Sequence, residues 1–266
     1  MSTQEDTNTH EEGVVLLERT ERVATITLSR PGALNALTWA MYQQLETHIE
    51  TLAQDETIRV IIICGAGKAF AAGTDISQFQ NFNGLAGVQY EQRMDTIIEK
   101  LYNFPKPIIA AIHGYAVGAG IVLSSVCDLR YATPSSRFGA PMARTLGNTL
   151  SIKNYQHIAE AFGPMRTREM LFTARLLSAE EALQCGFLTA IIEEEQVFAH
   201  VFEIARQISM LAPLTIWAVK EADRRAHAAE EGIPFDDVLE RVYNSRDFAE
   251  GVQAHREKRK PQWKGI

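Results

Sequence analysis

Short apolar runs alternate with longer amphipathic segments along most of the chain. Two of these runs, residues 59–64 (RVIIIC) and 108–113 (IIAAIH), are almost entirely apolar, which is typical of strands buried on both faces of a parallel sheet. Two runs near the N-terminus are separated by a short polar turn and predict a β-hairpin. In chain order, the predicted strands are residues 14–18, 23–28, 59–64, 108–113, 128–133 and 188–192.

The predicted helices follow apolar positions that recur every three or four residues. Thr38 is the expected N-cap of the first helix, and Ser178 with Glu181 forms a capping-box pattern at the start of a short one. In chain order, the predicted helices are residues 38–53, 86–103, 118–126, 178–186, 196–211, 214–229 and 235–248. Strands that alternate with helices predict an α/β fold with mostly parallel pairing, closed by a C-terminal helical block.

Three segments of the chain differ in character. Residues 1–12 are polar and acidic, and we expect a disordered tail there. Residues 13–195 hold every predicted strand and form the expected core, while residues 196–266 form the expected C-terminal helical region. No apolar stretch reaches about 18 residues, and the N-terminus has no apolar segment, so we expect neither a membrane partner nor a signal peptide.

Composition and charge narrow the classes of function. Of the 266 residues, 46% are hydrophobic and 22% are charged, as in an ordinary globular protein. The formal net charge of −7 argues against a nucleic-acid partner. Cys64, Cys127 and Cys185 lack metal-ligand spacing, and the histidines form no cluster, so we expect no metal site and a reducing, cytoplasmic location.

Two glycine-rich turns, residues 65–76 (GAGKAFAAGTDI) and 113–120 (HGYAVGAG), follow the two apolar strands. Glycine lets backbone N–H groups approach a ligand closely, so such turns can bind a phosphate or stabilise an oxyanion. Neither turn has the glycine spacing of a P-loop or of a dinucleotide-binding motif. The alternative is that both are simply tight turns, and His113 is expected to have a structural role beside one of them.

Both turns resemble the signature blocks of the crotonase (enoyl-CoA hydratase/isomerase) superfamily, and matching segments follow in the same order from about Val14 to Gly265. Other matching segments are RPGALNAL (30–37), FGAP (138–141), SAEEALQCGFL (178–188) and EKRKPQWKG (257–265). The resemblance implies a spiral of ββα units whose C-terminal helices form homotrimers, often paired as hexamers. It also implies an acyl-CoA substrate and no further cofactor, because coenzyme A is part of that substrate.

The resemblance also implies which residues form the site. Two backbone N–H groups of the family polarise the thioester carbonyl and stabilise the enolate, and they fall here on Thr74 and Ala119. The residues implied for coenzyme A are Ala33, Leu34, Lys68, Asp75, Ile76 and, from a neighbouring subunit, Lys258. For the two lysines a solvated surface role is an equal alternative. For Asp75, as for Asp128, we expect local bonds to backbone N–H groups.

The chain departs from the family where hydratases carry two glutamates. Their positions correspond to Val122 and to Met142, or to Ala143 with a different gap, and these side chains cannot transfer a proton. Isomerisation, decarboxylation, hydrolysis, weak hydration and a CoA-binding pseudoenzyme therefore all stay open. For another reaction, we expect Arg144 first, and also Asn148, as polar residues of the pocket. The full set of polar candidates is Arg144, Asn148, Ser151, Lys153, Tyr155, His157, Glu91 and Asp95.

Overall fold

The computed structural model describes residues 12–211, 213–227, 240 and 243–262. Its main sheet has the strand order β1-β2-β3-β4-β6-β9. The first two strands form the predicted antiparallel hairpin, and every later neighbour pairs in parallel. The bounds are β1 Val14–Thr20, β2 Val23–Ser29, β3 Val60–Gly65, β4 Ile108–Ile112, β6 Leu129–Ala132 and β9 Ala190–Ile191.

A second, smaller sheet has the strand order β5-β7-β8, with β5 at Tyr115–Val117, β7 at Arg137–Gly139 and β8 at Leu177–Ser178. Strands β4 and β6 of the main sheet are each followed by a strand of the small sheet, so the chain passes β4-β5 and then β6-β7, and β8 comes before β9. Ala71, which follows β3, pairs with Ala116 of β5 through an isolated β-bridge. The chain thus winds as successive ββα turns, as the sequence predicted.

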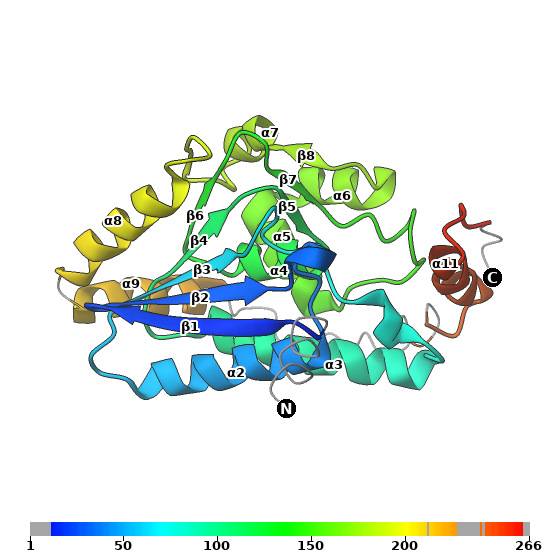
Figure 1. Ribbon diagram of the computed structural model, residues 1–266, viewed down its shortest axis with the longest axis horizontal. Coiled ribbons are helices and arrows are strands. Elements are labelled where there is room, and N and C mark those ends of the chain that lie inside the picture. The colour runs from blue at the N-terminus through cyan, green and yellow to red at the C-terminus, as the bar shows by residue number, and fades with distance from the viewer. Residues whose placement is uncertain (1–11, 212, 228–239, 241–242, 263–266) are drawn as a thin grey trace, which may run out of the picture.

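Helices cover both faces of the main sheet because the side chains of β3 alternate between two cores. Ile61 and Ile63 pack into the large core, which includes residues of α2 (Trp39–Gln54) and α3 (Gly84–Tyr102). Val60, Ile62 and Cys64 point the other way, against α8 (Val197–Ser209). Figure 1 shows α2 and α3 running below the sheet and α8 on its opposite side.

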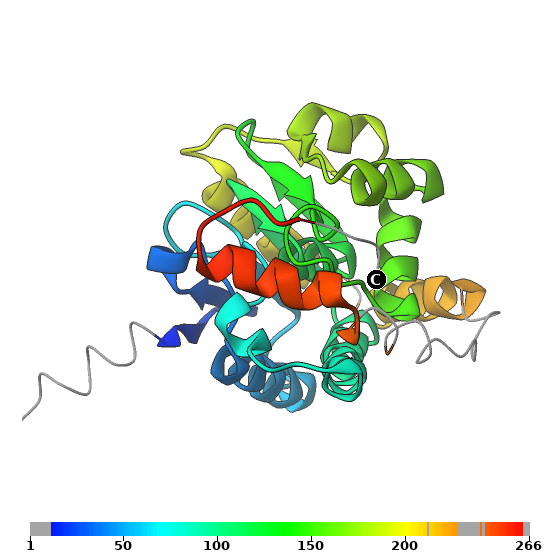
Figure 2. The same cartoon turned by 90° about the vertical axis from the view of Figure 1, so that its right-hand side faces the viewer.

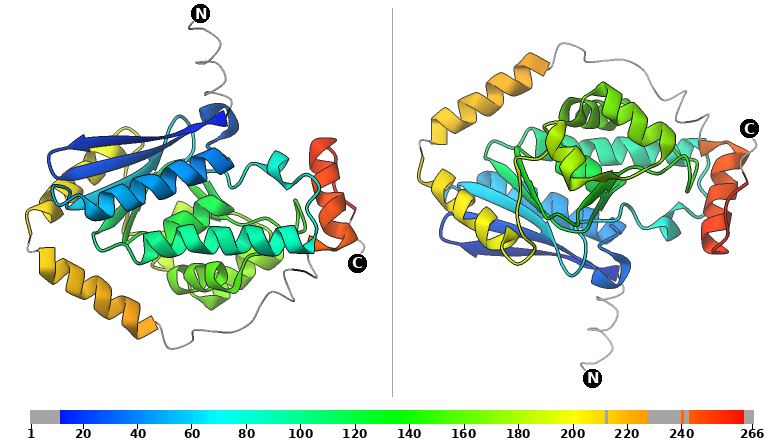
Figure 3. Two further views of the ribbon diagram at one scale, coloured as in Figure 1. Left: turned by 90° about the horizontal axis from the view of Figure 1, so that it is seen from below. Right: turned by 90° about the horizontal axis from the view of Figure 1, so that it is seen from above.

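The remaining helices are short or lie at the ends of the molecule. Their bounds are α4 Ala119–Ser125, α5 Ile152–Phe162, α6 Pro164–Thr173, α7 Ala179–Gln184, α9 Pro213–His227 and α11 Arg246–Arg256, with single turns η1 at Pro31–Ala33 and η2 at Ile76–Phe79. Figure 3 shows α9 and α11 at opposite ends of the molecule. In Figure 2, α11 lies across the end formed by η2 and the start of α3. Within the described residues, no helix is both long and apolar enough to cross a membrane.

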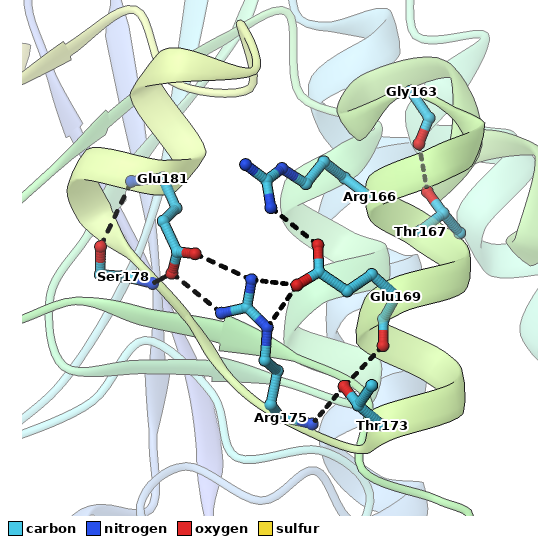
Figure 4. Close-up of polar contacts among 8 residues, drawn as sticks. All are labelled: Gly163, Arg166, Thr167, Glu169, Thr173, Arg175, Ser178 and Glu181. Atoms are coloured by element: carbon cyan, nitrogen blue, oxygen red, sulfur yellow. Dashed lines mark hydrogen bonds and ion pairs between the residues drawn. The ribbon is translucent and has the colours of Figure 1, made fainter.

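Arg175 joins α6 to α7 through two carboxylates. Its guanidinium donates to Glu169 on α6 at 2.7 Å and to Glu181 on α7 at 2.8 Å. Figure 4 shows the guanidinium between the two acids, with Arg166 on the far side of Glu169. Glu181 also completes the predicted capping box with Ser178. This corner of the fold is therefore fixed by local sequence signals.

The predicted α/β class and the hairpin are confirmed, and Thr38 caps α2 by accepting the N–H of Met41. Three predictions need correction. Residues 152–173, for which no element was predicted, form α5 and α6. The strand expected at 188–192 is reduced to two residues, because only Ala190 and Ile191 pair with β6. The C-terminal segment is helical at 246–256 (α11), although we expected the last helix to end near residue 248.

Residues 1–11 of the predicted tail and half of the predicted helix at 235–248 (residues 235–239, 241 and 242) lie outside the described residues. The boundary near residue 195 stays a prediction. The contacts of α8 bear on it, because Val197, Val201 and Ala205 share one core with the strands of the main sheet.

Candidate active site

The two glycine turns lie against each other at the end of the main sheet. Gly73 has a φ of +103° and Gly118 a φ of +56°, both in the region that favours glycine. A Cβ atom on Gly118 would lie 3.3 Å from the Cα of Gly73, and one on Gly73 would lie 3.8 Å from the nitrogen of Ala119. Glycine is favoured at both positions because of these positive φ angles, and the close approach to Gly73 adds to this preference at Gly118.

The backbone N–H groups of Thr74 and Ala119 have no acceptor in the part of the chain that the structure describes. Both residues line one cavity of about 200 Å³. Ala119 is the first residue of α4, so its N–H cannot bond within the helix. The structure thus places the two donors that the resemblance implied beside the same cavity, and neither has an acceptor among the described residues. Their role as an oxyanion hole stays a prediction.

A chain of hydroxyl groups holds Thr74 in place. Its Oγ1 lies 2.7 Å from the hydroxyl of Tyr42 on α2 and 2.8 Å from the hydroxyl of Tyr90 on α3. Burial raises the pKa of both tyrosines above the ordinary value, so both hydroxyls stay protonated. The turn that carries the Thr74 amide is therefore fixed by two helices.

The walls of the cavity are mostly apolar. Val122 and Met142, which stand where family hydratases carry glutamates, both line it. Val122 is only 4% exposed. No lysine or arginine is found among the described residues of the lining, whose apolar side chains include Ile76, Phe79, Met94, Ile98, Leu123, Leu146 and Leu150.

Glu91, on α3, is a carboxyl group in this wall and is only 3% exposed. Its Oε1 accepts the hydroxyl of Tyr243 at 2.9 Å, and its Oε2 accepts the N–H of Ser151 at 2.9 Å. Burial raises the pKa of Glu91 from 4.5 to about 8, and these two donors only partly offset that rise. The group can therefore hold or release a proton near neutral pH.

Of the next three polar candidates, the structure places one in the cavity lining and two outside it. Asn148 lines the cavity, and its Oδ1 is buried without a donor among the described residues. Arg144 is exposed and outside the lining, although its neighbours Met142 and Thr145 line the cavity. The expected pocket arginine is thus not found. Asp95 is also outside the lining and accepts the hydroxyl of Ser151 at 2.5 Å.

Three further candidates from the divergent stretch face away from the cavity. His157 bonds Glu99 at 3.0 Å, and Lys153 lies 3.8 Å from the same carboxylate. Tyr155 does not line the cavity. His157 and Lys153 thus join α5 to α3.

The residues expected at coenzyme A lie mainly on the surface. Ala33 is half-buried in η1, Leu34 is exposed at its end with a φ of +50°, and Lys68 and Lys258 are exposed. Ile76, in contrast, lines the cavity. Their contacts with coenzyme A stay predictions.

Asp75 makes the local bond to a backbone N–H that we expected, whereas Asp128 bonds a backbone N–H 20 positions away in sequence. Asp75 accepts the N–H of Ser77 at 3.0 Å and pairs with Arg30 at 2.8 Å. Asp128 accepts the N–H of Ile108 at 2.6 Å and pairs with a lysine of α9. His113 lies 3.0 Å from the carbonyl oxygen of Gly67 and so connects the two glycine turns.

Two residues of the C-terminal region were missed by the sequence analysis, one that bonds a cavity residue and one that lines the cavity itself. Tyr243 reaches Glu91 across 152 positions of sequence, and His255 on α11 lines the cavity. The sequence does carry a signal for the contact of Tyr243. Gly84 and Gly87 lie in α3, and glycine in a helix costs about 1 kcal/mol of stability relative to alanine. The two glycines therefore indicate that another segment packs closely against this helix.

Comparison with known proteins agrees with this geometry. Residues 18–266 match the family described as enoyl-CoA hydratase/isomerase. The chain is 31% identical to the 2,3-dehydroadipyl-CoA hydratase of Escherichia coli, over 94% of this chain and 98% of that protein. It is 30% identical to the short-chain-enoyl-CoA hydratase of Clostridium acetobutylicum, over 92% and 95% respectively.

Solved structures show the same likeness. An enoyl-CoA hydratase/carnithine racemase from Magnetospirillum magneticum superposes with a TM-score of 0.78 at 31% identity, covering 98% of this chain and all of that one. A methylmalonyl-CoA decarboxylase bound to 2-nitronate-propionyl-CoA superposes with a TM-score of 0.86 at 29% identity, covering 95% and 99%. Matched over nearly its whole length, this chain belongs to the enoyl-CoA hydratase/isomerase family, the crotonase superfamily that its glycine turns indicated.

Proposed function

We propose that this enzyme moves the double bond of an enoyl-CoA thioester without adding water. The observation that carries the proposal is the cavity itself. Two free N–H groups, those of Thr74 and Ala119, face it, while Val122 and Met142 occupy the positions of the two hydratase acids. Such a site can stabilise an enolate, but it lacks the pair of acids that hydration uses in this family.

The proposed step is a proton transfer between two carbons. A base removes a proton from C2 of a 3-enoyl-CoA, and the electron pair spreads onto the thioester oxygen and C4. The amides of Thr74 and Ala119 hold the negative oxygen. Return of the proton to C4 gives the conjugated 2-enoyl-CoA. The apolar lining supports this role because it suits a hydrocarbon chain and excludes water.

A second candidate is decarboxylation of a 2-carboxyacyl-CoA. It is favoured by the TM-score of 0.86 with a methylmalonyl-CoA decarboxylase. In this reaction the bond from C2 to the carboxylate breaks, carbon dioxide leaves, and the same two amides hold the enolate until C2 takes up a proton. An apolar cavity favours loss of the charged carboxylate, since burying a charge is costly.

The test is to incubate the full chain with 3-hexenoyl-CoA, crotonyl-CoA, methylmalonyl-CoA and malonyl-CoA and to identify products by mass spectrometry and NMR. The proposal expects conversion of 3-hexenoyl-CoA at unchanged mass. Loss of carbon dioxide from a carboxyacyl-CoA would favour the second candidate. Binding without conversion would identify a pseudoenzyme. Ala119→Pro is the matched control, since proline lacks the N–H but is tolerated at the first position of a helix.

Three finer features belong to the same proposal. The backbone at Ala33 and Leu34 would bind the adenine, and Lys68 with Lys258 of a neighbouring subunit would bind the phosphates. Asp75 and Ile76 would adjoin the bound coenzyme. The enzyme would act in the cytoplasm. It would form a homotrimer or a dimer of trimers, and light scattering of the purified protein would test this oligomeric state.

A further inference from the structure

Resting on this proposed function, we infer that Glu91 is the catalytic residue that moves the proton, and that Tyr243 is a positioning residue that holds its carboxyl group. Glu91 stands on α3, whereas the two positions that family hydratases use lie on α4 and after β7. The acid–base group would thus approach the substrate from a different wall of the same cavity.

Placement in the cavity is the first support. Glu91 is the only carboxylic acid among the described residues of the lining, which also holds Thr74 and Ala119. A base must be within reach of the carbon next to the carbonyl that the amides bind. Glu91 lines the same cavity of about 200 Å³ as Thr74 and Ala119, which places it beside the space that the thioester would occupy.

The second observation in support is that the ring of Tyr243 packs into a space on α3 that a glycine leaves open. Tyr243 is only 1% exposed, and a Cβ atom on Gly87 would lie 2.0 Å from its Cγ. The ring therefore fits against α3 only because that position is glycine. Its hydroxyl then reaches Oε1 of Glu91 at 2.9 Å, while the Ser151 N–H holds Oε2. Two donors from different segments fix the plane of the carboxyl group.

The surroundings of Glu91 keep a proton available at neutral pH. Burial raises its pKa to about 8, and Asp95 on the next turn of α3 adds a second negative charge. No lysine or arginine faces Glu91 among the described residues of the cavity. The titratable groups around it are Asp95 and Tyr90 on α3, Tyr42 on α2, and Tyr243 and His255 of the C-terminal region.

Two amide side chains in the same wall have acceptors without a donor. Asn154 on α5 is 3% exposed and lines the cavity, yet its Oδ1 has no donor among the described residues. The Oδ1 of Asn148 is in the same situation. Buried acceptors are rarely left without a donor, so each is expected to accept from an ordered water or from an N–H group of bound coenzyme A, since the hydrocarbon part of an enoyl chain offers no donor.

The experiment is deuterium uptake at C2 of butanoyl-CoA in D2O, measured by NMR for the full chain. This exchange needs only a base and the two amides, so it is independent of which reaction the enzyme completes. We expect exchange by the wild type, a loss of about 100-fold or more in Glu91→Gln, and near-normal exchange in Glu99→Gln, the matched control on the same helix, which bonds His157 and lies outside the cavity lining. Circular dichroism and binding of butanoyl-CoA should be retained in both variants.

The positioning role of Tyr243 has its own readout. The hydroxyl lowers the pKa of Glu91, so Tyr243→Phe should move the rise of the exchange rate to higher pH while leaving the plateau nearly unchanged. Gly87→Ala, which displaces the ring without removing the hydroxyl, should do the same.

Two results would overturn the inference. One is exchange by Glu91→Gln within a few-fold of wild type, which would make Glu91 only a structural link between α3 and α5. The other is a folded, ligand-binding wild type that exchanges nothing. If exchange depends on Glu91 while 3-hexenoyl-CoA is left unchanged, Glu91 stands and the proposed reaction fails.

Discussion

Replacing Glu91 with glutamine should make the protein more stable relative to the wild type as the pH rises. The folded state raises the pKa of Glu91 from 4.5 to about 8. A carboxyl group shifted in this direction favours folding when it is protonated. Its contribution is complete below pH 4.5 and is lost as the pH rises through about 8. Glutamine has no proton to lose, so this dependence disappears in the variant.

The size of the effect follows from the shift. Each pKa unit corresponds to about 1.4 kcal/mol, so the change from 4.5 to about 8 gives at most about 5 kcal/mol between the two limits. The difference in unfolding free energy between Glu91→Gln and wild type should therefore grow by about 1.4 kcal/mol per pH unit from about pH 5 to about pH 8.

Urea unfolding followed by tryptophan fluorescence, at fixed protein concentration and several pH values in this range, measures the difference directly. Glu99→Gln is the control, because Glu99 lies on the same helix but its bond to His157 lowers its pKa. The contribution of Glu99 is lost only as the pH falls, so its difference should be flat over this range. A flat difference for Glu91→Gln as well would refute the account of its burial.

Three further substitutions test other parts of the structure. Ala119→Pro should reduce turnover by about 100-fold or more while circular dichroism stays unchanged, since it removes one amide donor. Val122→Glu should produce measurable hydration of crotonyl-CoA, at a stability cost of about 1–3 kcal/mol for burying a polar group; a folded variant with no hydration would mean either that position 122 does not face the reacting carbons or that the second acid is indispensable. Ser178→Ala should lower the unfolding free energy by about 1 kcal/mol through loss of the capping box, and no change in urea unfolding would contradict that role.

The elements that were predicted from sequence have strong local signals. The apolar run at β3 is buried on both faces, and Thr38 and Ser178 cap their helices by the bonds that their positions suggest. α5 was missed because its buried face includes Asn154 and His157, so its apolar periodicity is broken. Those polar residues are buried because they pack against acids of α3, a tertiary effect that no local pattern contains.

The site shows the same division. Thr74 and Ala119 could be located because the glycine turns that contain them are continuous in sequence, so the resemblance of these turns to the family's signature blocks implied both residues. Arg144 was misplaced because exposure depends on how the loop after β7 turns, which the residue type does not fix. The bond between Glu91 and Tyr243 joins residues 152 positions apart, so only the folded chain reveals it.

The most direct test of the central claim is to follow a single sample of 3-hexenoyl-CoA and the full chain by NMR and to compare two rates, formation of 2-hexenoyl-CoA and formation of 3-hydroxyhexanoyl-CoA. Our account predicts that the conjugated thioester accumulates and that little or no water is added, because Val122 and Met142 supply no acid. Accumulation of the hydroxy product at the rate of isomerisation, or no reaction at all, would contradict it.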